Sequence, residues 1–188
     1  MLLDEKIVAI SRSFESHEVP HAFAGANALA FYGVPRATLD IDINVFLPAA
    51  DAPRVLGLLG ELGVAVDDPR ILAAVARDEQ VRVFWDRTPL DLFFAYDPLH
   101  ESSMKRRRRV DFLDDPIWVL TGEDLIVYKA IFDRAKDWRD IAEIVFASEQ
   151  RLDFDYVRGW VDRIDDESGT RTARLERLIR SGGRDLDA

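Results

Sequence analysis

The sequence predicts an α+β protein, in which a small mixed β-sheet is flanked by helices and the C-terminal third is helical. Apolar and polar residues alternate over 38–47, as they do in a half-buried strand. Two more strand-like segments, 80–85 and 90–95, are joined by a short turn. From Gly122 onward, apolar residues recur at three- and four-residue steps, which is the helical period.

The length of 188 residues fits one domain, or one domain with a helical appendage. We expect an α/β core over 1–120 and a helical region over 121–188 that packs on this core. The hydrophobic and charged fractions of 48% and 32% are typical of soluble globular proteins. The absence of cysteine excludes disulfides, thiol nucleophiles and zinc–thiolate sites.

Charge and apolar runs narrow the classes of partner. A net charge of −10 argues against broad DNA binding, which needs a basic surface. No apolar run approaches the roughly 18–20 residues of a membrane span, so we expect no membrane partner. The start of the chain is acidic too early for a signal peptide. These features together favour a cytoplasmic location.

The first third of the chain contains a helix, a short strand, a short helix and a longer strand. Their expected ranges are 3–18, 22–24, 27–32 and 38–47. Pro20 ends the first helix, and Gly33 ends the second.

The middle and the end of the chain follow the same kinds of pattern. We expect helices at 52–62 and 69–76, a hairpin from 80 to 95 through the turn 86–89, a helical or irregular segment at 97–105, and strands at 107–113 and 117–120. The expected C-terminal helices are 123–134, 136–147, 154–164 and 171–179.

Asp40 and Asp42 give the strongest chemical signal. Residues two apart in a strand share a face, so both carboxylates project together and repel unless a cation or a shared proton lies between them. The opposite face carries the apolar residues Leu39, Ile41, Ile43 and Val45. The pattern therefore predicts a rigid metal site, or else an ordinary strand whose outer face is acidic.

Asp91 favours the metal site. It interrupts the apolar segment 89–94, where an unpaired acid would be costly to bury. A neighbouring strand that carried Asp91 beside Asp40 and Asp42 could complete an oxygen cage for Mg²⁺ (or Mn²⁺). Two such ions can activate an attacking oxygen and stabilise a leaving phosphate.

The turn Gly25-Ala26-Asn27 follows a strand and opens a helix. Glycine lets the backbone approach a ligand closely, and the N–H groups at a helix start favour phosphate. Such a turn is common for steric reasons alone, so it is evidence for a phosphate site only through its spacing to Asp40.

The turn at 24–27, the helix through Tyr32-Gly33 and the segment Arg36-Ala37-Thr38-Leu39-Asp40-Ile41-Asp42 together resemble the signature of the polymerase-β-like nucleotidyltransferase superfamily. With Lys129 and the later segment Arg134-Ala135-Lys136-Asp137-Trp138-Arg139-Asp140, the chain resembles the AbiEii-type branch of small bacterial nucleotidyltransferases. Many members of that branch are toxins of toxin–antitoxin pairs. The resemblance covers roughly residues 20–147.

The resemblance implies transfer of a nucleoside monophosphate from an NTP to an acceptor hydroxyl. Asp40, Asp42 and Asp91 would bind the metal ions, and Asp91 would also take the acceptor's proton. The turn from Gly25 to Asn27 would hold phosphates. Arg36, just before the strand, would either contact phosphate or pair with a carboxylate. The acceptor would be RNA such as tRNA, a protein or a small molecule, and an antitoxin would be a further partner.

Lys129 and Asp137 carry two interpretations each. Lys129 is the only charge among the eight residues 125–132. It either reaches solvent along an apolar face or, as the resemblance implies, neutralises the leaving pyrophosphate. Asp137 either caps its helix or contacts the nucleotide, and Asp140 is expected at the surface or behind the site.

Three alternatives remain open. Ala26 stands where the family usually has Gly or Ser, which favours a catalytically inert binding partner. A metal-dependent phosphohydrolase could use the same carboxylates, although the three histidines lack metal-ligand spacing. The basic run from Lys105 to Arg109 is either a solvated edge, which we favour, or an acceptor contact.

Overall fold

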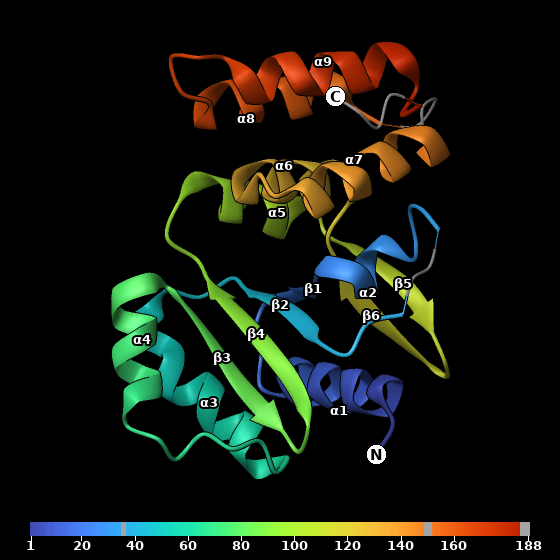
Figure 1. The fold of residues 1–188 in the computed structure, drawn as a ribbon. Coiled ribbons are helices and arrows are strands. Elements are labelled where there is room, and N and C mark those ends of the chain that lie inside the picture. The colour runs from blue at the N-terminus through green and yellow to red at the C-terminus, as the bar shows by residue number, and fades with distance from the viewer. Residues whose placement is uncertain (35–36, 149–151, 185–188) are drawn as a thin grey trace. The chain divides into compact units, whose positions relative to one another are not determined.

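The computed structural model describes residues 1–34, 37–148 and 152–184 (Figure 1). The chain forms two compact units. The first, here called the sheet unit, comprises Met1–Asn27 and Ala37–Leu120. The second, the helical unit, takes the described residues within Ala28–Arg36 and Thr121–Ala188. The expected core of 1–120 thus needs one correction, because the segment that begins at Ala28 clusters with the C-terminal helices.

The sheet unit contains a six-stranded sheet in the order β3-β4-β2-β1-β6-β5. The strands are β1 (His21–Phe23), β2 (Ile41–Val45), β3 (Gln80–Trp85), β4 (Thr88–Phe94), β5 (Arg108–Phe112) and β6 (Asp115–Val119). Strands β2 and β4 are parallel, as are β1 and β6, whereas β1–β2 and the hairpins β3–β4 and β5–β6 are antiparallel. The mixed sheet of the expected α+β fold is confirmed.

Helices of the sheet unit form where the sequence places apolar residues at helical spacing. They are α1 (Leu3–Ser16), the 3₁₀ turn η1 (Ala49–Asp51), α3 (Ala52–Glu61), α4 (Arg70–Asp78) and α5 (Pro98–Arg106). Ile7, Ile10 and Phe14 of α1 are fully buried, and α1 packs on β6 and α3. The segment 97–105 is resolved as a helix because Asp97 caps it, accepting from the backbone N–H of Leu99 at 2.8 Å.

The helical unit is built from α6 (Gly122–Phe132), α7 (Ala135–Ser148), α8 (Phe154–Ile164) and α9 (Thr170–Ser181). Thr121 and Asp153 cap α6 and α8 through backbone N–H groups three residues on, at 3.2 and 3.0 Å. Helix α6 packs on α7 and α8. Within residues 1–34, 37–148 and 152–184, no helix is both long and apolar enough to cross a bilayer.

Strand β2 positions the acidic residues. Ile41, Ile43 and Val45 are fully buried, so the intervening side chains point to the other face of the sheet. The expectation for Leu39 is wrong, because β2 begins at Ile41 and Leu39 is 84% exposed. Asp40 therefore immediately precedes the strand instead of lying within it.

Candidate functional site

Asp42 and Asp91 lie side by side on parallel strands. In the register of β2 and β4, Asp42 pairs with Asp91, and paired residues project from the same face of a sheet. Neighbouring strands lie about 4.8 Å apart, so the sheet brings together two of the three acids that the sequence singles out. Both side chains are half-buried.

A glycine turn lies directly against Asp42. Helix α2 (Gly25–Leu29) begins at Gly25, whose φ of +55° suits glycine. A Cβ atom at Gly25 would lie 1.8 Å from Oδ2 of Asp42, so no larger residue fits there. The main chain holds the same contact, since the Ala24 N–H donates to the Asp42 carbonyl at 2.9 Å. Gly25 is thus required for the close approach of the turn to this carboxylate.

The other turn residues have structural contacts. Nδ2 of Asn27 donates to the Asp40 carbonyl at 3.0 Å, which ties the turn to the start of β2. Ala26 is buried, with 5% of its surface exposed. Because α2 has only five residues, its dipole is small and we assign no anion site to the helix itself.

Asp40 is oriented by the segment before it. The Thr38 hydroxyl donates to Oδ1 of Asp40, and the Asp40 N–H donates to Thr38 Oγ1 at 3.4 Å. Arg36, the expected phosphate contact, lies outside the described residues.

Asp91 has a partner that the sequence analysis did not identify. Nε and Nη2 of Arg82 donate to Oδ1 and Oδ2 of Asp91 at 2.7 and 2.6 Å, a bidentate ion pair. The two-residue turn Asp86-Arg87 fixes this register, in which Arg82 of β3 faces Asp91 of β4. Counting back from that turn in the sequence would have found the pair.

The field of all three acids acts on Arg82. Its pKa is raised, first by the hydrogen bond and charge of Asp91 and further by the charges of Asp40 and Asp42. The four side chains therefore form one electrostatic group, in which Arg82, Asp91 and Asp42 share a face of the sheet.

The donor set fits a divalent cation in its chemistry, because aspartate oxygens are the ligands that Mg²⁺ prefers. Within the part of the chain that the structure describes, however, no three His, Asp or Glu side chains are grouped closely enough to hold a metal ion. In this structure Asp91 is bound to Arg82. Metal binding by these acids stays a prediction.

Lys129 lies in a buried ion pair. Its Nζ contacts Oδ2 of Asp140 at 2.5 Å, and the two side chains are 9% and 8% exposed. Lys129 therefore does not reach solvent, which was one of its two interpretations, and Asp140 is not at the surface. The helical period of α6 and α7 places the two residues inside the helical unit, where each offsets the charge of the other.

Asp137 has the contacts of a helix cap. Its Oδ2 accepts from the backbone N–H of Arg134 at 3.2 Å and from Nε of Arg134 at 2.6 Å. A carboxylate that reaches back in this way satisfies an N–H group at the start of α7. The geometry favours the capping interpretation over nucleotide contact.

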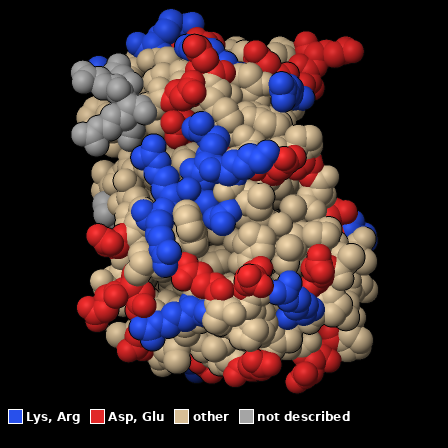
Figure 2. Space-filling model, turned by 180° about the vertical axis from the view of Figure 1, so that it is seen from behind, with Lys and Arg blue, Asp and Glu red and all other residues tan. Residues whose placement is uncertain are grey.

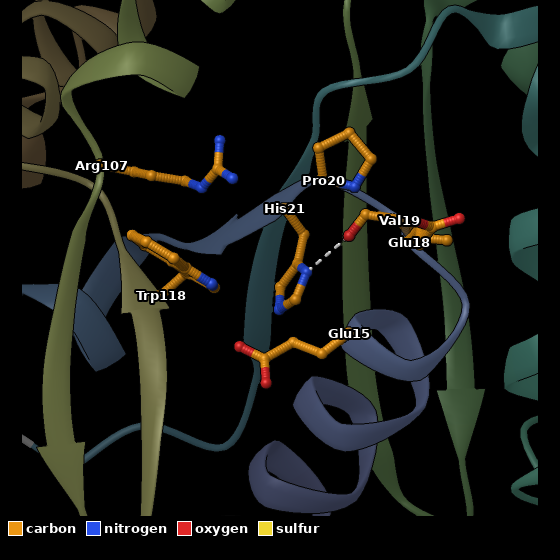
Figure 3. Close-up of a pocket in the computed structure, with 7 residues that line it drawn as sticks. All are labelled: Glu15, Glu18, Val19, Pro20, His21, Arg107 and Trp118. Atoms are coloured by element: carbon orange, nitrogen blue, oxygen red, sulfur yellow. Dashed lines mark hydrogen bonds between the residues drawn. The ribbon is translucent and has the colours of Figure 1, made fainter.

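A pocket of about 350 Å³ lies at the other end of β1 from Gly25 (Figure 3). Its lining includes Glu15, His21, Arg107 and Trp118. His21 is 1% exposed, and burial lowers its pKa from 6.5 to about 4, with a smaller contribution from the charge of Arg107. The imidazole is therefore neutral at physiological pH, in a structural role beside the first strand.

The basic run is largely engaged with its own unit. Lys105 pairs with Glu101 at 2.5 Å and Arg109 with Glu15 at 3.3 Å. Arg107 stacks on the ring of Trp118 at 4.6 Å. Figure 2 shows one face on which Lys and Arg side chains gather although the chain is acidic overall. Acceptor contact by the run stays a prediction.

Comparisons with known proteins show the fold. No family model matches the chain, and no curated protein matches it. The solved structure of the antibiotic-resistance factor ANT(2'')-Ia is similar, with a TM-score of 0.61 and 16% identity over 95% of this chain and 97% of that one. A candidate nucleotidyltransferase from H. pylori has a TM-score of 0.55 and 16% identity, over 98% and 95% of the two chains. JHP933 from Helicobacter pylori has a TM-score of 0.52 and 14% identity, over 98% and 92%.

Proposed function

We propose that this chain, which shares its fold with nucleotidyltransferases, transfers a nucleoside monophosphate from an NTP to an acceptor hydroxyl with the help of Mg²⁺ or Mn²⁺. The observation that carries the proposal is the register of Asp42 with Asp91 beside Gly25. Identity to the similar structures is low, so the proposal rests on the side chains of this chain within that fold.

Asp40, Asp42 and Asp91 would hold the metal ions. Bound there, divalent cations supply activation of the attacking oxygen and stabilisation of the leaving pyrophosphate. Gly25 keeps the backbone close to Asp42 without a side chain in the way. Asp91, which lies on the same face as Asp42, would accept the proton of the acceptor hydroxyl once Arg82 has released one of its oxygens. Gly25–Asn27 and Arg36 remain the proposed nucleotide contacts.

We assign Lys129 no catalytic role, because its ammonium group is bound by Asp140 inside the helical unit. Asp137 is likewise left out of the proposed site, since its carboxylate caps α7.

The proposed acceptor classes are RNA such as tRNA, a protein and a small molecule. The AbiEii-type resemblance adds the proposal that the chain is a toxin with an antitoxin partner. The similarity in fold to an antibiotic-resistance factor adds a small hydroxylated compound to the acceptors worth testing.

The test is transfer of label from each of the four NTPs, labelled at the α-phosphate, to total RNA, total protein or a panel of hydroxylated small molecules. Wild type should label one class of acceptor only with Mg²⁺ or Mn²⁺, and Asp42→Asn should label none. Asp115→Asn is a control, because Asp115 is also an acid on a strand of the sheet unit, where it is bound by Arg12. Equal labelling by wild type and Asp42→Asn would refute the proposal.

A second candidate function is an inert, nucleotidyltransferase-like binding partner. The buried Ala26 and the ion pair that engages Asp91 favour it. It predicts that wild type labels no acceptor and that neither Mg²⁺ nor Mn²⁺ raises its melting temperature.

A further inference from the structure

Three neighbouring strands align one basic and two acidic residues in a single row. Arg82 of β3 is paired with Asp91 of β4, and Asp91 is paired with Asp42 of β2. Paired residues share a face of the sheet, so the guanidinium group lies on the same face as the acids. Asp91, one of the proposed metal ligands, is therefore already bound by the guanidinium group of Arg82.

The exposure of the pair is uneven. The Asp91 side chain is 17% exposed, whereas that of Arg82 is 53% exposed. Arg82 also lies on β3, at the end of the strand order. A long, half-exposed side chain can turn into water with little loss of packing. The carboxylate stays in place on β4, which is paired with a strand on each side.

The ion pair between Arg82 and Asp91 offsets the repulsion between two neighbouring carboxylates. Asp42 and Asp91 are on strands about 4.8 Å apart, and like charges at that distance raise the free energy of the folded state unless a cation offsets them. Arg82 offsets them in this structure, since its guanidinium group donates to both carboxylate oxygens of Asp91, at 2.7 and 2.6 Å. A divalent cation on Asp91 would repel the same guanidinium group.

We propose that Arg82 is a built-in counter-ion that occupies Asp91 and that a divalent cation must displace in order to bind. This inference rests on the proposed function, because it takes Asp42 and Asp91 as metal ligands. Arg82 then acts as a positioning residue that sets the metal concentration at which the site fills. Competition of this kind makes a clear prediction, which is that removing Arg82 tightens metal binding.

The test is the affinity for Mn²⁺ by calorimetry, in the full chain, for wild type, Arg82→Gln and Arg82→Lys. An exposed ion pair contributes up to about 1 kcal/mol, so Arg82→Gln should bind Mn²⁺ about threefold to fivefold more tightly than wild type. Arg82→Lys, which keeps the charge but loses the bidentate geometry, should lie between them. Mn²⁺ should also raise the melting temperature of Arg82→Gln by more than that of wild type.

Two controls separate competition from a general effect of charge. Arg12→Gln removes the same charge from another bidentate pair of the sheet unit, with Asp115, and should bind Mn²⁺ as wild type does. In an Asp91→Asn background, Arg82→Gln should no longer tighten binding, because Arg82 acts through Asp91.

The outcomes separate this inference from the proposed function. If Asp42→Asn weakens Mn²⁺ binding but Arg82→Gln does not tighten it, only the inference is overturned. If wild type and Arg82→Gln both fail to bind Mn²⁺ at millimolar concentration, the inference and the metal part of the proposed function both fail. If Arg82→Gln tightens binding and no acceptor is labelled, the inference stands without the transferase.

Discussion

Neutral, buried His21 should make the folded protein sensitive to mild acid. Its Nδ1 lies 2.9 Å from the Val19 carbonyl, which can only accept, so Nδ1 carries the proton (Figure 3). Nε2 is buried and has no hydrogen-bond partner among the described residues. Phe14 and Phe23 contact the ring edge-on at 5.2 and 5.8 Å. Protonation would place a charge in these surroundings, which explains the pKa of about 4.

The magnitude follows from linkage. The unfolded chain binds the proton near pH 6.5 and the folded chain only near pH 4, so acid favours the unfolded state. The full difference between the two pKa values corresponds to about 3 kcal/mol, reached only below the folded-state pKa. Between pH 7 and pH 5 the loss from this one residue is about 2 kcal/mol.

The assay compares the free energy of unfolding in urea at pH 7 and pH 5 for wild type and His21→Asn, whose amide can still donate to the Val19 carbonyl. Wild type should lose about 2 kcal/mol more than the variant over this range, because the contributions of the carboxylates are common to both. Exposed His17 supplies the control His17→Asn. Parallel pH dependence of wild type and His21→Asn would refute the reasoning.

Three further predictions concern the turn and the helical unit. Gly25→Ala should lower the free energy of unfolding by about 1–3 kcal/mol and weaken Mn²⁺ binding in calorimetry, because the new Cβ would lie 1.8 Å from Oδ2 of Asp42. An unchanged Mn²⁺ affinity would contradict this prediction. Lys129→Met should lower the free energy of unfolding in urea by about 3–5 kcal/mol. The double variant Lys129→Met with Asp140→Leu should regain most of that stability. A double variant no more stable than the single one would argue against the buried pair. Ala26→Ser should leave NTP affinity unchanged, because the proposed contacts of this turn are made by backbone N–H groups and the Ala26 side chain is buried. Tightening by about tenfold or more would show that the new hydroxyl reaches the nucleotide.

Local patterns in the sequence predict most of the elements. The helix at 154–164 has the predicted bounds. The predicted hairpin also forms, but its turn has two residues, 86–87, where the sequence analysis expected four. The alternation at 40–45 correctly places Ile41, Ile43 and Val45 in the core. Each of these depends on residues within a few positions of one another, where side-chain period and turn chemistry act directly.

The expectations that needed correction depend on residues far apart in the chain. Leu39 continues the alternation but lies before the strand, because pairing with β4 begins at Ile41. The segment from Ala28 clusters with C-terminal helices that begin more than ninety residues later, and helical spacing carries no information about such a partner.

The sequence by itself therefore determined the α+β class, the strand that carries Asp42 and the glycine turn before it. Tertiary structure alone decided which charges meet: Asp42 beside Asp91, Asp91 bound to Arg82, and Lys129 bound to Asp140. The physical reason is that periodicity fixes the face on which a side chain lies, whereas its partner is set by strand register and helix packing. A carboxylate in an apolar strand needs a polar or charged partner, but only the strand register determines which residue that partner is.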